Sequence, residues 1–142
     1  MKIAKSYCYA LAGVALLFTS LCSAQVAVVA SAKSSIAPLT QEQVAALYVG
    51  SSFVLPGGGS VTLLDQPEGD VRKQFYSKIT DKSASQIKST WSRLTFSGKG
   101  TPPKEMSNSG EIKKQITANP TTIGYIEKSA VDSSVKVLYL AE

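Results

Sequence analysis

Short apolar segments with strand character alternate with segments of helical periodicity along most of this 142-residue chain. The strand-like segments cover residues 25–30 and 60–65, and two more lie near Ile123 and Val135. The first is a valine-rich run without polar alternation, which is typical of a strand that is buried on both faces. Because strands and helices alternate, the sequence predicts an α/β fold with a mostly parallel or mixed sheet flanked by helices.

Capping and breaking residues mark the expected helices. Thr40 and Gln43 have the spacing of a capping box, in which each side chain satisfies the backbone amide of the other residue. Pro67 suits the first turn of the next helix, because its missing amide hydrogen would be unpaired there in any case. Ser83 is a candidate cap for a third helix, and residues 107–109 offer caps for a fourth. The apolar side chains at helical spacing on these four segments are Val44, Leu47, Tyr48, Val71, Phe75, Ile79, Ala84, Ile87, Trp91, Leu94, Ile112 and Ile116.

A helix stop followed by a strand marks the last third of the chain. Asn119 and Pro120 end the fourth helix, because proline cannot extend a helix and restricts the residue before it. Residues 122–126 then read T-I-G-Y-I, a short strand. Its glycine, Gly124, is expected where a side chain would obstruct a close approach of another element.

The first 24 residues have the pattern of a secretory signal peptide. Two lysines form a positive start, residues 7–21 are almost entirely apolar or small, and small residues precede a predicted cleavage after Ala24. A retained membrane anchor is the alternative, but the apolar run is shorter than the ~20 residues that span a bilayer. We therefore expect a periplasmic protein with a signal peptide at 1–24, one domain at 25–142 and no membrane span after cleavage.

The side-chain inventory excludes several kinds of active site. The chain has no histidine, and its two cysteines, Cys8 and Cys22, lie in the predicted signal peptide. Ser-His-Asp catalysis, Cys-His catalysis and the usual zinc sites are therefore excluded. Loss of Lys2 and Lys5 with the signal lowers the formal charge from +5 to +3, and the remaining basic residues are scattered. We expect no enzyme, no cofactor, no metal site and no nucleic-acid partner.

Several short motifs occur along the chain in one order. They are L-T-Q-E-Q-V and L-Y-V-G at 39–44 and 47–50, D-Q-P-E-G at 65–69, Phe75-Tyr76, Trp91, G-K-G at 98–100 and I-G-Y at 123–125. The series resembles the second lobe of the phosphate-binding periplasmic proteins of ABC transporters, over roughly residues 26–140. This resemblance implies a three-layer single lobe with the type II periplasmic-binding-protein fold. The family's first lobe, built from both chain ends, is expected to have no counterpart here.

The resemblance also implies where a ligand would bind. Glu68 matches an acidic position that accepts a proton from hydrogen phosphate in the family. The ligand-facing helix of the family opens with Ser-Gly-Thr, where this chain reads Asp70-Val71-Arg72. Asp70 repels an anion, whereas the guanidinium of Arg72 can donate two hydrogen bonds to an oxyanion. The candidate binding residues are Glu68, Gly69, Asp70 and Arg72, with no catalytic residue.

The same residues also have a purely structural interpretation. Arg72 is of a type that is usually solvated on a helix surface. Glu68 and Asp70 can complement the positive end of a helix, an effect worth ~0.3–1 kcal/mol each. The residues alone do not separate these roles from ligand binding.

Two functions remain open from the sequence. The first is an exported, periplasmic solute-binding-like protein that binds phosphate or another small oxyanion in ABC-type phosphate uptake or sensing. A homodimer partner or an envelope protein would then supply the missing lobe. The alternative is an interaction module without a ligand, which docks on an envelope transporter, sensor or outer-membrane protein.

Overall fold

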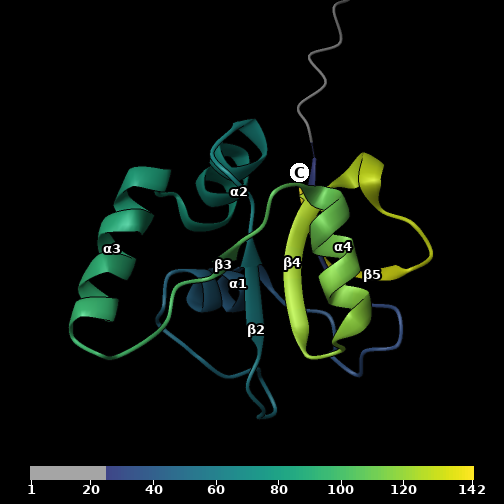
Figure 1. Ribbon diagram of the computed structural model, residues 1–142, viewed down its shortest axis with the longest axis horizontal. Coiled ribbons are helices and arrows are strands. Elements are labelled where there is room, and N and C mark those ends of the chain that lie inside the picture. Colours follow the sequence, from purple (N-terminus) through teal and green to yellow (C-terminus); the bar gives the residue numbers. More distant parts are fainter. Residues whose placement is uncertain (1–24) are drawn as a thin grey trace, which may run out of the picture.

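A computed structural model describes residues 25–142, which form a five-stranded mixed sheet with helices on both faces (Figure 1). The predicted signal peptide at residues 1–24 lies outside the described residues. Within the described part, no helix has the length and apolar character needed to cross a membrane. The strands are β1 (Val26–Ser31), β2 (Thr62–Asp65), β3 (Lys104–Glu105), β4 (Thr122–Glu127) and β5 (Val135–Ala141). The helices are α1 (Gln41–Tyr48), α2 (Asp70–Thr80), α3 (Ala84–Phe96), α4 (Ser109–Ala118) and the short 3₁₀ helix η1 (Lys128–Ala130).

The sheet has the strand order β3-β2-β4-β1-β5. β1 runs antiparallel to both of its neighbours, with Val28 opposite Tyr125 on β4 and Tyr139 on β5. β2 runs parallel to β3 and to β4. The predicted α/β fold with a mixed sheet is confirmed, and the two-residue strand β3 is an addition that the sequence did not indicate.

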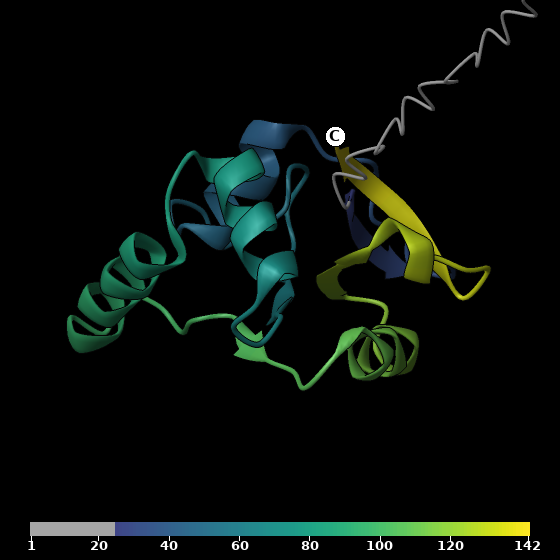
Figure 2. The same cartoon turned by 90° about the horizontal axis from the view of Figure 1, so that it is seen from above.

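Each face of the sheet carries its own apolar core, because successive residues of a strand point to opposite sides. Val26 and Val28 pack with residues of α1, α2 and α3, whereas Ala27 and Val29 pack with residues of α4. Figure 2 shows α4 across the sheet from α1 and α2. All six residues of β1 are buried, as the valine-rich run predicts. The fold therefore has three layers.

The predicted capping residues begin three of the helices. Thr40 accepts a hydrogen bond from the Gln43 amide at 3.3 Å, and the Gln43 side chain accepts one from the Thr40 amide at 2.9 Å. Ser83 and Gln86 form the same reciprocal pair at the start of α3. Asn108 is the member of the 107–109 group that caps α4. Local sequence thus sets these three starting points.

The start of α2 differs from the prediction. The helix begins at Asp70, with Gly69 as its N-cap residue, and Pro67 lies before it rather than in its first turn. Gln66 explains the delay, because its backbone amide donates to the Tyr125 hydroxyl at 3.1 Å. The Gln66 side-chain amide also donates to the Tyr125 carbonyl at 3.1 Å. These two contacts hold the chain against β4, so the helix begins only after the chain has left the sheet.

Candidate functional site

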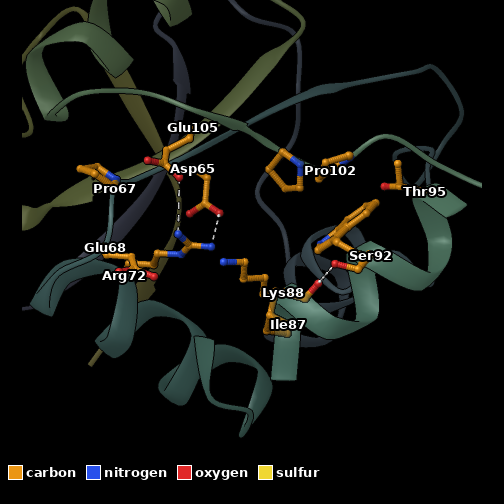
Figure 3. A pocket seen from close by; sticks show the side chains of 12 residues that line it. Asp65, Pro67, Glu68, Arg72, Ile87, Lys88, Ser92, Thr95, Pro102 and Glu105 are labelled. Carbon is orange, nitrogen blue, oxygen red and sulfur yellow. Dashed lines mark hydrogen bonds and ion pairs between the residues drawn. The ribbon is translucent and has the colours of Figure 1, made fainter. Parts of the chain in front are cut away.

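A groove of about 720 Å³ lies between α2 and α3, beside the segment that leads into β3 (Figure 3). It lies at the carboxyl end of β2, where ligands commonly bind in sheets with parallel strands. Its remaining walls come from apolar and hydroxyl side chains of α3 and from three prolines. The ionisable residues that line the groove are Asp65, Glu68, Arg72, Lys88 and Glu105.

Asp65 is the buried centre of a hydrogen-bond network at one end of this groove. Its carboxylate accepts hydrogen bonds from the Tyr76 hydroxyl at 2.8 Å, from the Tyr125 hydroxyl and from the Gln66 amide at 2.9 Å. Burial raises the pKa of Asp65, and the hydrogen bonds from Tyr125 and Tyr76 only partly oppose that effect. Burial and the nearby Asp65 also raise the pKa of both tyrosines, so their hydroxyls remain protonated donors.

Arg72 lies in the first turn of α2 between two carboxylates. Its guanidinium forms ion pairs of 3.6 Å with Asp65 and of 3.6 Å with Glu105 on β3. The guanidinium carbon also lies 5.8 Å from the ring centroid of Tyr76, within range of a cation–π interaction. The side chain is only 13% exposed, and its Nε has no hydrogen-bond partner in the described structure. Arg72 is therefore held in place electrostatically while one buried donor remains uncommitted.

The structure brings two of the four predicted binding residues together. Glu68 and Arg72 both line the groove. Gly69 and Asp70 are exposed and are not among its lining residues. Gly69 occupies the N-cap position of α2 without any side-chain hydrogen bond to the first turn. The proposed contacts of all four residues with a ligand stay predictions.

Three further charged residues line the groove, and the sequence contained little indication that they would lie there. Asp65 ends β2 and belongs to the D-Q-P-E-G motif, so its place at a strand end beside Glu68 was the available clue. Lys88 follows the buried Ile87 on α3 and reaches the groove only because α3 packs beside α2. Glu105 lies on β3, which itself was not expected. Sequence separation hides these neighbours, since they come from three different elements.

The groove contains more acidic than basic side chains. Three carboxylates and two basic groups line it, which gives a formal sum of −1 when all five are ionised (2 − 3 = −1). Two of the carboxylates are engaged with Arg72. Among residues 25–142, no cluster of histidine, cysteine, aspartate or glutamate has the arrangement of a metal site. The arrangement offers hydrogen-bond donors and acceptors to a polar ligand.

The sequence matches no protein-family model and no curated protein. Solved structures, however, share its arrangement of strands and helices. A protein described as a phosphate ABC transporter substrate-binding protein from Clostridium perfringens, solved with bound phosphate, aligns with a TM-score of 0.64 at 22% identity. An ABC-type phosphate transport receptor from Vibrio cholerae and PstS from Borrelia burgdorferi give TM-scores of 0.62 and 0.57, at 19% and 14% identity. The chain has the fold of these phosphate receptors.

The match to the phosphate-receptor fold is partial. Each alignment covers 81% of this chain but only 45%, 46% and 47% of the three receptors. The chain therefore spans less than half the length of the receptors it matches, and a partial, single-lobe form of the fold fits these values. The first two are described as a substrate-binding protein and a receptor of phosphate transport. The resemblance of the short motifs is thus confirmed at the level of the fold.

Proposed function

We propose that this protein is an exported, periplasmic solute-binding-like protein that binds phosphate or another small oxyanion in ABC-type uptake or sensing. The observation that carries the proposal is the phosphate-receptor fold, which one similar protein presents with phosphate bound. In this proposal, residues 1–24 form a cleaved signal peptide. Residues 25–142 form the single binding domain.

The proposed ligand contacts surround the start of α2. Arg72 offers its guanidinium at the wall of the groove, and Glu68 on the same groove accepts a hydrogen bond from a protonated oxyanion. Backbone amides at Gly69 and Asp70 add donors at the positive end of the helix. The absence of a side-chain cap at Gly69 supports this role, because the first-turn amides have no competing side-chain acceptor there.

Calorimetric titration of phosphate into the purified protein tests the proposal, with sulfate as a second anion. We expect micromolar phosphate binding that Arg72→Ala weakens by about tenfold or more, because a charge-assisted hydrogen bond is lost. Arg93→Ala is the matched control, since Arg93 is exposed on α3 and does not line the groove.

The controls separate a binding defect from unfolding. Circular dichroism must show that Arg72→Ala is folded, because that substitution also leaves Asp65 without its ion pair. Absence of heat at millimolar phosphate with folded wild-type protein would overturn the proposed function. Equal loss of binding in the Arg72 and Arg93 variants would remove Arg72 from the site.

A second candidate function is an interaction module that docks on an envelope protein or on another copy of this chain. Exposed aromatic rings favour it: Phe96 at the end of α3 is 96% exposed, and Phe53 is 45% exposed. A contiguous exposed apolar patch is typical of an interaction surface. In the oxyanion-binding proposal, the same kind of partner supplies the second wall that a single lobe lacks.

A further inference from the structure

The size and lining of the groove indicate a ligand larger than a free oxyanion. Its volume of about 720 Å³ falls within the range of sites for small organic molecules. A single tetrahedral anion fills only a small part of such a space. Apolar walls formed by Ile87, Trp91 and Pro102 give an organic group surface to contact.

The charges of the groove argue against a ligand that is only anionic. An anion that contacts Arg72 also approaches Asp65 and Glu105, because both carboxylates lie 3.6 Å from the same guanidinium. Glu68 adds a third carboxylate to the lining. Like charges brought together in a partly enclosed site repel. A ligand that also carries a positive group would offset this repulsion.

Lys88 completes a basic pair inside this acidic frame. Its side chain extends from α3 toward the guanidinium of Arg72 (Figure 3). Lys88 forms no ion pair with another residue of the described chain. Its ammonium group is therefore available to an anionic group beside the Arg72 guanidinium, while Glu68 and Glu105 line the same groove.

We propose that the ligand of this groove is a small zwitterionic phosphate compound, in which a phosphate monoester or phosphonate carries an ammonium group. The phosphate lies between Lys88 and Arg72, and the ammonium group contacts Glu68 and Glu105. This inference rests on the proposed function, since it names the ligand class of the same site. Unlike binding of a simple oxyanion, this inference gives the carboxylates of Glu68 and Glu105 a direct role in recognising the ligand.

Four probes separate the two charges of the ligand: inorganic phosphate, ethyl phosphate, 2-aminoethyl phosphate and ethanolamine. Binding is measured by calorimetry and by the fluorescence of Trp91, the single tryptophan of the chain, which lines the groove. We expect 2-aminoethyl phosphate to bind about fivefold more tightly than ethyl phosphate, as one additional partly solvated ion pair allows. Ethanolamine is expected to bind weakest.

Three substitutions locate the residues that recognise the ligand. Glu68→Gln and Glu105→Gln are each expected to reduce the preference for the amino compound, whereas Lys88→Ala weakens both phosphate esters. Glu42→Gln is the matched control, because Glu42 is exposed on α1 outside the groove. If ethyl phosphate or inorganic phosphate binds as tightly as 2-aminoethyl phosphate, this inference fails and the proposed function stands. If none of the phosphate compounds binds, the proposed function fails with it.

Discussion

Asp65 shows how one buried carboxylate organises several parts of the chain. Tyr76 reaches it from α2 and Tyr125 from β4, and Arg72 pairs with it from the first turn of α2. The Phe75 ring stacks on Tyr125 with their centroids 3.8 Å apart, which fixes the tyrosine from its other side. Polar partners offset part of the cost of burying this charge. The network therefore orders the end of the groove that Asp65 and Arg72 line.

The pKa of Asp65 is expected to lie above the usual aspartate value of 3.8, and the pKa of Asp132 is expected to lie below it. Burial raises the pKa of Asp65, so its contribution to folding stability falls as pH rises from 3.8 through the raised value. Hydrogen bonds from Ser134 and Lys113 lower the pKa of Asp132 to about 2, so its contribution is lost as pH falls from 3.8 toward that value. Carbon-detected NMR of the side-chain carboxyls measures both. An Asp65 midpoint at or below 3.8 would contradict the assigned environment.

At the scale of elements, Gly124 sets how closely α4 packs on the sheet. A Cβ atom at this position would lie 2.6 Å from Cγ2 of Ile112 and 3.3 Å from Cδ1 of Ile116. The sequence prediction of a glycine at a point of close approach is therefore confirmed. Both isoleucines are fully buried, so the helix has little room to withdraw.

Gly124→Ala is expected to lower the free energy of unfolding by about 1–3 kcal/mol, because the added methyl group overpacks this contact. Chemical denaturation of the variant measures the change. The double variant Gly124→Ala/Ile112→Ala serves as the control, since removal of the Ile112 side chain relieves the clash. Its cost should be smaller than the sum of the two single costs. Strict additivity would show that the two side chains do not compete for the same space.

The elements themselves were largely predictable, and their exact contacts were less so. Thr40, Ser83 and Asn108 act within three residues of their own position, so sequence alone indicates the helices they cap. The predicted helix start at Pro67 was wrong, because the start of α2 depends on the contact of Gln66 with Tyr125 on β4, 59 residues away in the sequence. The strand β3 was not predicted for the same reason: it forms only through its pairing with β2, which lies far away in the sequence.

At the scale of the whole molecule, the chain lacks the length of the receptors whose fold it shares. Phe53 packs edge-on against Trp91 at a centroid distance of 6.4 Å, close to the groove. The Phe96 ring makes almost no contact within its own chain. If another subunit provides the second wall of the binding site, that subunit can pack against the rings of Phe53 and Phe96.

Phe96→Ser is expected to leave the free energy of unfolding unchanged to within about 0.5 kcal/mol, because surface substitutions remove few contacts. The same change should weaken any association that covers this surface. Thermal denaturation measures the first effect, and sedimentation velocity with and without phosphate measures the second. Val137→Ser, on the exposed side of β5, is the control for a general loss of surface apolar area. A monomer under all conditions for the wild type and both variants would direct the search to a different partner protein.

The sequence by itself determined the buried strand, the capped helices, the mixed α/β architecture and the position of Glu68 and Arg72 near a helix start. These features depend on capping, breaking and periodicity, which act over a few neighbouring residues. Only the tertiary structure placed Lys88 and Glu105 beside Arg72 and buried Asp65 beneath it. Such neighbours depend on how separate elements pack, because charges far apart in the chain meet only once the helices and the sheet have assembled.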